Sequence, residues 1–217
     1  MYPAVKYLCN YNKNILNVRK RYDETLYNLL EEVDNINVSD ITKYPELITD
    51  RNICYYNKTR IRINKMWNDK NKKEGDLFLS KPVAKSKDED KYINLTQDMY
   101  IYENMPVIAM RTLFDKEEGL LFANSETFNI NFIGDEAIGI YNERPDETGQ
   151  IEPYYLHVPI EDFNKYFLMN YCSTTHKTQG ETITENFTIY DWDAMDTKLR
   201  YTALSRAKKI EQVYIRN

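Results

Sequence analysis

Two polar segments near the end of the chain constrain its fold more than any other feature. The first is Tyr171-Cys-Ser-Thr-Thr-His-Lys-Thr-Gln-Gly-Glu-Thr182, and the second is Tyr201-Thr-Ala-Leu-Ser-Arg-Ala207. Each segment indicates a strand or helix that ends in a polar turn. Together they supply an amide-rich bend and an arginine on a helix, the two parts needed to hold a phosphate chain. We therefore interpret the rest of the chain as the scaffold for this pair.

These segments resemble the last two motifs of superfamily 1 nucleic-acid helicases, most closely those of the RecD-like and Pif-type branch that moves 5′ to 3′. In that family the motifs read T-x-H-K-[ST]-Q-G-x-T and Y-[VT]-A-[LF]-[ST]-R-A. Residues 174–182 and 201–207 match them in the same order, and an apolar run over 213–215 follows. The resemblance implies an α/β fold, the parallel RecA-like sheet of a second motor domain.

An earlier segment resembles the fourth motif of the same family, an apolar strand followed by N-x-x-x-x-x-[IL]-N. Residues 52–56 form a short apolar run of the kind buried in parallel sheets, and Asn57, Ile63 and Asn64 match the rest of the motif. Arg60 lies one turn into the predicted helix, where related helicases often place a phosphate-contacting arginine. A solvated basic helix face explains Arg60 and Arg62 equally well.

The middle of the chain has a different pattern. Turn-forming residues separate five strand-like runs, at 105–114, 120–123, 127–133, 137–141 and 154–158. This spacing favours a small antiparallel barrel, and the resembled branch inserts an SH3-like barrel just before its Thr-His-Lys motif. We therefore predict a RecA-like domain from residues 1–104 and 168–217, with a barrel inserted over 105–167 that guides the strand as a pin or clamp. The family turn N-G-[ED] is replaced by Asn124-Ser-Glu126.

Local signals predict the elements that flank this insertion. Asp23 is a plausible N-cap for a helix whose apolar face is Leu26, Leu29, Leu30 and Val33. Residues 168–174 and 187–190 are predicted as buried strands. Asp196 or Thr197 is predicted to cap the helix that carries Arg206.

The resemblance also implies the roles of individual residues. Arg206 would be the catalytic arginine delivered to a nucleotide, a contribution of roughly 10³ to 10⁵ in rate where enzymes use one; the alternative is a salt bridge at a helix end. The remaining implied contacts are with the nucleotide, for Gln179, Gly180, Glu181, Lys177 and Arg60, and with a single strand, for Asn57, Thr175, His176 and Thr178. Lys177 could serve either ligand, and His176 outside this motif is more typical of a packed or capping histidine.

One familiar motif is missing from the chain. It contains no G-x-x-x-x-G-K-[ST] loop, and no acidic strand end followed by the family's glutamine motif. We therefore expect ATP and Mg²⁺ to be held mainly by an N-terminal RecA-like domain that these 217 residues lack. The chain would then be the C-terminal half of an ATP-dependent helicase, with negligible ATPase activity alone.

The acidic net charge of the chain leaves two alternative functions possible. The net charge of −5 and the pI near 5.3 count against a general nucleic-acid-binding surface, which is usually basic. A non-catalytic nucleic-acid-binding or protein-docking module with helicase shape is one alternative, and an RNA helicase of the viral superfamily 1 type is the other. Single-stranded DNA is the favoured partner over RNA.

Composition adds expectations about location and metals. No apolar run approaches the roughly eighteen residues that would span a membrane, and the first residues lack a signal-peptide layout, so an intracellular protein without a membrane partner is expected. Abundant Asn, Lys, Ile and Tyr is typical of an AT-rich genome, such as that of a virus acting in host cytoplasm or nucleus. Cys9, Cys54 and Cys172 are far apart and odd in number, so no disulfide framework or metal site is predicted, and the last two are expected to be buried thiols.

Overall fold

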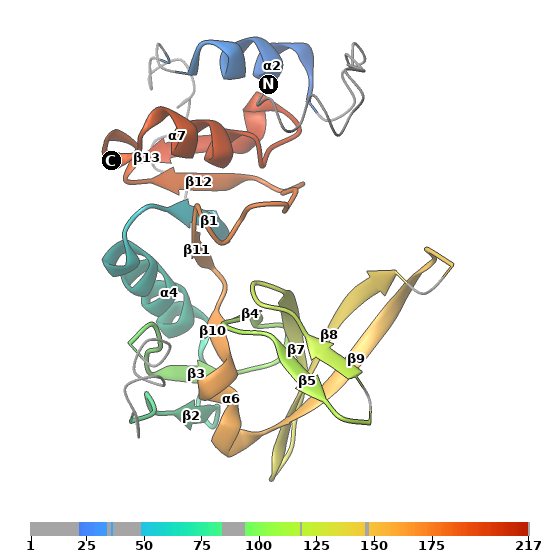
Figure 1. Cartoon of the computed structure of the whole chain (residues 1–217). Helices are drawn as coiled ribbons and strands as arrows, with labels where there is room; N and C mark the ends of the chain where they lie inside the picture. Colours follow the sequence, from blue (N-terminus) through green and yellow to red (C-terminus); the bar gives the residue numbers. More distant parts are fainter. Residues whose placement is uncertain are drawn as a thin grey trace.

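The computed structural model describes residues 22–33, 36, 49–83, 94–117, 119–145 and 148–216. Its upper part in Figure 1 is built around a four-stranded sheet in the order β11-β1-β12-β13. Every pairing in this sheet is parallel, as the alternation of strands and helices predicted. The four strands are β1 (Arg51–Cys54), β11 (Cys172–Thr174), β12 (Phe187–Tyr190) and β13 (Val213–Arg216).

Helices cover both faces of this sheet because successive side chains of each strand point to opposite faces. Ile53 and Ile189 pack into one buried cluster with residues of α2 (Glu24–Glu31) and α7 (Thr197–Leu204). Cys54 packs into a second cluster, with residues of α4 (Asn57–Asn71) and of the antiparallel part. Cys54 and Cys172 are both fully buried free thiols, as expected, whereas Cys9 lies outside the described residues.

The helix predicted after Asp23 is present as α2. The Asp23 carboxylate accepts a hydrogen bond from the Leu26 amide at 2.8 Å, so it satisfies one of the free donors at the helix start. Leu26, Leu30 and Val33 are buried, which confirms the predicted apolar face. Asp196 caps α7 in the same way, with 2.9 Å to the Leu199 amide.

The prediction of one strand over residues 168–174 was wrong. The segment forms β10 (Phe167–Met169) and β11, which belong to different sheets. The chain breaks at Asn170, whose carbonyl accepts from the Arg51 guanidinium and whose amide donates to the Pro106 carbonyl. Residues 168–173 are all buried, so hydrophobicity does not reveal the break.

The lower part in Figure 1 contains a five-stranded antiparallel sheet in the order β10-β4-β7-β8-β9. Its long β8–β9 hairpin projects away from the body of the chain. The 105–114 run, predicted as one strand, is two strands that belong to different sheets. The strands are β4 (Pro106–Ala109), β5 (Leu113–Asp115), β6 (Gly119–Phe122), β7 (Thr127–Ile133), β8 (Ala137–Pro145) and β9 (Ile151–Pro159).

Smaller elements complete the described chain. β2 (Leu77–Leu79) pairs with β3 (Met99–Ile101), and β5 pairs with β6, each as an antiparallel hairpin. Helix α6 (Ile160–Tyr166) joins β9 to β10, and two 3₁₀ turns, η2 (Trp192–Ala194) and η3 (Ile210–Gln212), flank α7. None of the helices in the described ranges is long and apolar enough to cross a membrane.

The Asn124-Ser125-Glu126 turn has a backbone that favours glycine at its central residue. Ser125 has a φ of 67°, in the left-handed region that favours glycine. The turn docks on β4, because the Ser125 amide donates to the Ala109 carbonyl and the Ala109 amide donates to the Glu126 carbonyl. The Glu126 carboxylate then accepts from Arg144 and Asn142 of β8.

Replacing Ser125 by glycine should therefore stabilise the protein. A non-glycine residue in the left-handed region is strained by on the order of 1 kcal/mol, and glycine removes this strain at some cost in chain entropy. We expect the free energy of unfolding, measured with urea, to rise by about 0.5–1 kcal/mol. Ser125→Ala is the control, since it keeps Cβ; a gain of equal size for alanine would contradict the backbone explanation.

Candidate functional site

The carboxyl ends of the parallel strands meet at one edge of the sheet, and the matched motifs lie there. Residues 175–180 follow β11, α4 begins at Asn57 just after β1, and Asp191 follows β12. Thr175 ties the first two segments together, because its amide donates to the Cys54 carbonyl at 2.9 Å. In open parallel sheets this edge is where ligands bind.

Asp191 organises this edge, and the sequence reasoning did not identify it. Its carboxylate accepts from the Tyr55 amide at 3.2 Å, the Tyr56 amide at 3.0 Å and the Thr59 hydroxyl at 2.9 Å. Its own φ of 61° is left-handed, which aspartate tolerates better than most residues. The only signal in the sequence was an acidic residue at the end of an apolar strand. Asp191 therefore fixes the start of α4 against β12.

The four residues predicted to contact a single strand divide into two pairs. Asn57 and His176 are exposed at the sheet edge. Thr175 and Thr178 are fully buried, and their hydroxyls donate within the protein, to the carbonyls of Cys54 and Thr175 respectively. The surface at this edge is therefore made by Asn57, His176 and the neighbouring Tyr56, which is 42% exposed.

Arg206 and the predicted bend are in direct contact. The Arg206 guanidinium donates to the Thr178 carbonyl at 3.0 Å and to the Glu181 carbonyl at 2.9 Å. These two carbonyls lie on either side of Gln179 and Gly180. It also donates to the Thr202 carbonyl, and the side chain is only 7% exposed. Gly180 has a φ of 89°, so the bend has a glycine where the backbone requires it.

Arg206 does not lie on a helix, contrary to the prediction. Helix α7 ends at Leu204 and Ser205 is its C-cap, so Arg206 is the second residue after the helix. The Ser205 hydroxyl accepts from the guanidinium at 2.8 Å. Arg206 therefore cross-links the connection before β12 to the connection after it.

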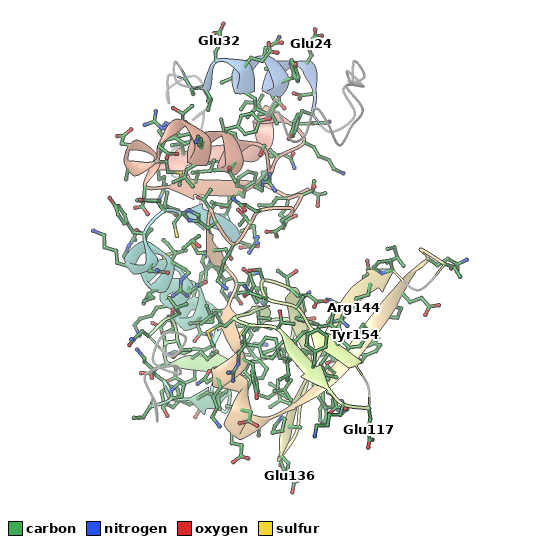
Figure 2. All side chains as sticks on the ribbon, viewed as in Figure 1. Glu24, Glu32, Glu117, Glu136, Arg144 and Tyr154 are labelled. Atoms are coloured by element: carbon green, nitrogen blue, oxygen red, sulfur yellow. The ribbon has the colours of Figure 1, made fainter. Side chains whose placement is uncertain are left out.

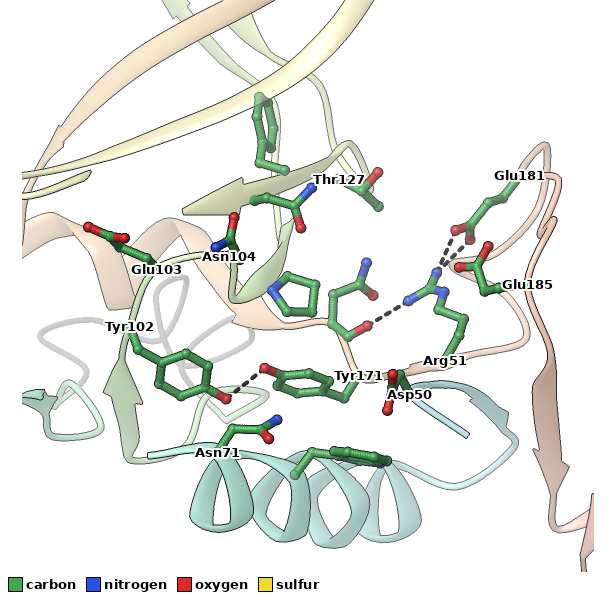
Figure 3. Close-up of a pocket in the computed structure, with 15 residues that line it drawn as sticks. Asp50, Arg51, Asn71, Tyr102, Glu103, Asn104, Thr127, Tyr171, Glu181 and Glu185 are labelled. Atoms are coloured by element: carbon green, nitrogen blue, oxygen red, sulfur yellow. Dashed lines mark hydrogen bonds and ion pairs between the residues drawn. The ribbon is translucent and has the colours of Figure 1, made fainter. Parts of the chain in front are cut away.

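The Glu181 side chain lies in an ion pair that the sequence did not reveal. Both of its carboxylate oxygens accept from the Arg51 guanidinium, at 2.6 and 2.7 Å, and the Arg51 side chain is 9% exposed (Figure 3). Arg51 also donates to the Asn170 carbonyl at 2.7 Å. The carboxylate that we expected at a ribose hydroxyl is thus occupied by a partner from the start of β1.

Lys177 and Arg60 are the predicted nucleotide contacts with spare donors. Within the described part of the chain, the Lys177 ammonium has no hydrogen bond or ion pair. Burial lowers its pKa, and the nearby positive charge of Arg60 lowers it further. Arg60 is 2% exposed and donates to Asn57 and to the Leu95 carbonyl, while its Nη1 has no partner among the described residues. Burial also lowers the Arg60 pKa.

Two openings separate the parallel sheet from the antiparallel part. A groove of about 720 Å³ lies between residues 177–181 and strands β7 and β8. A cavity of about 520 Å³ opens beside the Arg51–Glu181 pair, where the hydroxyls of Tyr102 and Tyr171 are 2.6 Å apart (Figure 3). Burial raises the pKa of both tyrosines, so both stay protonated. Among the described residues no cluster of His, Cys, Asp or Glu could hold a metal ion.

A parallel sheet with these segments at its carboxyl edge, together with a large antiparallel part, is also the fold found in solved Pif1 helicases. The chain is similar to Bacteroides Pif1 bound to ssDNA, with a TM-score of 0.59 and 15% identity over 90% of this chain and 50% of that one. It is also similar to Bacteroides Pif1 in complex with ADP-AlF3 and ssDNA, with a TM-score of 0.58 and 14% identity over 91% and 50%.

A third solved structure, Pif1 helicase from Candida albicans, gives a TM-score of 0.56 and 11% identity over 90% of this chain and 54% of that one. The chain therefore spans about half the length of these helicases. At such low identity the likeness concerns the fold. No family profile and no curated protein matches the sequence.

Proposed function

We propose that this chain is the second RecA-like motor domain of an ATP-dependent helicase that moves 5′ to 3′ on single-stranded DNA. The observation that carries the proposal is the contact between Arg206 and the carbonyls of Thr178 and Glu181. The two motifs, residues 174–182 and 201–207, are far apart in sequence and meet at this contact. Lys177 lies beside it, and its ammonium has no partner among the described residues. The Pif-type fold supports the same interpretation.

The nucleotide would lie between this domain and a partner motor domain that holds most of ATP and the Mg²⁺ ion. ATP would supply the free energy for movement. In this chain, Lys177 and Arg60 have unused N–H donors, which suit phosphate oxygens. Gln179 and Gly180 would present backbone to the nucleotide. Closure of the two domains would bring Arg206 to the γ-phosphate, in exchange for the carbonyls that it now contacts.

The single strand would cross the carboxyl edge of the sheet. Asn57 and His176 would donate to its phosphates, with Tyr56 available for stacking against a base. Thr175 and Thr178 would act through the shape of the bend, since their hydroxyls are used internally. Such contacts give affinity without sequence preference.

We further propose that residues 105–167 form the SH3-like insertion of this branch, within a motor domain made of 1–104 and 168–217. The Asn124-Ser125-Glu126 turn supports this correspondence, because Ser125 adopts the backbone of the family glycine. A pin or clamp role for this insertion would be steric, since it contributes few positive charges to hold a strand.

Binding of oligo-dT by the purified chain tests the proposal. With one to three phosphates neutralised by lysine or arginine, the slope of log affinity against log salt concentration should lie between about −0.7 and −2. His176→Ala and Asn57→Ala should each weaken binding several-fold, while Lys65→Gln, on the solvent side of α4, should not. Binding that is absent or independent of salt would instead support the protein-docking alternative, and tighter binding to oligo-U than to oligo-dT would favour an RNA helicase.

A further inference from the structure

Charge is distributed unevenly between the two parts of the chain. Residues 105–167 contain twelve acidic and four basic residues, a net charge of −8. The remaining residues contain 22 acidic and 25 basic residues, a net charge of +3. The antiparallel part therefore repels phosphate, and the parallel-sheet part does not.

One face of the antiparallel sheet carries exposed aromatic rings. We define the aromatic face as Phe132, Tyr141, Tyr155 and His157, on strands β7, β8 and β9. Tyr141 and Tyr155 are direct cross-strand partners with ring centroids 6.1 Å apart, and Phe132 and His157 are also 6.1 Å apart. Phe132 and Tyr155 are 50% and 59% exposed, so these rings are not part of the core.

The core lies on the opposite side of the same strands. Side chains that alternate with the aromatic face, such as Ile138, Ile140 and Val158, are buried. Arg144 of β8 also points to the core side of the sheet. Its guanidinium lies 3.6 Å from the centre of the Tyr154 ring (Figure 2) and forms an ion pair with Glu126. The aromatic face thus has no lysine or arginine among these strand residues.

Gly139 shapes the middle of the aromatic face. It is the cross-strand partner of both Phe132 and His157. A Cβ at this position would lie 2.8 Å from Asn131 Oδ1 and 3.0 Å from Phe132 Cβ, so the neighbouring side chains close over the glycine. The rings therefore form a continuous surface, and the exposed carboxylate of Glu143 follows Tyr141 on the same side of β8.

We propose that the aromatic face docks a lysine- or arginine-rich segment of a partner protein. Aromatic rings attract the cationic side chains through their electron-rich faces, and Glu143 offers an anion beside them. The net charge of −8 on this part of the chain attracts such a segment and disfavours the phosphates of a nucleic acid. Tyr141 and Glu143 also line the groove that faces residues 177–181, whereas Phe132 and Tyr155 are not among its lining residues. Variants at Phe132 and Tyr155 therefore test the docking site apart from the sheet edge that we propose for the single strand.

Fluorescence anisotropy with a labelled nona-arginine peptide tests the proposal on the whole chain. The Phe132→Ala/Tyr155→Ala double variant should weaken binding roughly tenfold, and Tyr155→Phe, which keeps the ring, should bind like the original protein. Glu143→Gln should weaken binding about threefold. The matched controls are Phe114→Ala, a 69% exposed phenylalanine on β5, and Glu117→Gln, a carboxylate next to the β5–β6 turn (Figure 2). Neither control should reduce binding to the same extent.

Two outcomes would overturn the docking site. Equal losses in the face variants and in their controls would mean that the peptide responds only to overall charge. Loss of oligo-dT affinity in the double variant, with peptide affinity unchanged, would place a nucleic acid on this face instead. Circular dichroism and thermal unfolding identify any variant that is misfolded. If the double variant misfolds, Glu143→Gln tests the site instead, and an unchanged peptide affinity would then overturn the proposal.

Discussion

In a protein that contains both motor domains, Arg206→Ala should lower the ATPase turnover number by about 10³ and abolish unwinding. The KM for ATP and the affinity for single-stranded DNA should change little, because most nucleotide and strand contacts come from other groups. Steady-state ATPase and strand-displacement assays measure these effects. The variant also loses four hydrogen bonds, so its unfolding must be measured in parallel.

Ser205→Ala separates the catalytic role of Arg206 from its structural one. It removes one acceptor of the guanidinium and leaves the arginine in place. We expect its ATPase activity to fall by no more than a few-fold. If Arg206→Ala still unwinds DNA normally, or if Ser205→Ala loses as much activity as Arg206→Ala, the arginine is a structural cross-link and the assignment of a catalytic role is wrong.

The second large effect is expected at the Arg51–Glu181 pair. Glu181→Gln removes the charge that two short hydrogen bonds bring to a guanidinium with a 9% exposed side chain. A buried cation without its counterion is strongly destabilising, and partial exposure of Glu181 reduces the penalty. We expect the free energy of unfolding to fall by about 2–3 kcal/mol, measured by urea denaturation.

Glu185→Gln is the matched control for this prediction. Glu185 lines the same cavity (Figure 3) and is exposed, and its carboxylate accepts hydrogen bonds from the amide and hydroxyl of the neighbouring Thr184. Its substitution should change stability by less than 0.5 kcal/mol. Equal destabilisation by both variants would show that the cavity responds to its total charge rather than to the Arg51–Glu181 pair.

Local signals in the sequence were sufficient for much of the parallel sheet. The Asp23 and Asp196 caps, the apolar runs of β1, β12 and β13, and the helix after Asn57 are all present, because each depends on neighbouring residues. Breaks inside buried runs were not predictable in this way. At Asn170 the carbonyl accepts from Arg51, 119 positions away in the sequence, and the 105–114 run divides between two sheets.

The same contrast, between signals from neighbouring residues and contacts between distant ones, applies to the candidate site. Contact between Arg206 and the bend was anticipated, because both belong to motifs with a known order. The ion pair of Glu181 with Arg51 and the three hydrogen bonds accepted by Asp191 join residues more than 100 positions apart, and no spacing rule indicates them. Burial of Thr175 and Thr178 likewise depends on contacts of the bend with Cys54 of β1 and with Arg206.

The position of Arg206 has a mechanical consequence. Its guanidinium binds carbonyls of the loop that enters β12 and of the helix end that leaves the same strand. A phosphate that competed for this guanidinium would break the hydrogen bonds to both segments, the loop before β12 and the helix end after it, at the same time. His176 is in the first of these segments, two residues before Thr178. In the proposed motor, hydrolysis would therefore reset the grip on DNA through one short segment, without a long relay across the domain.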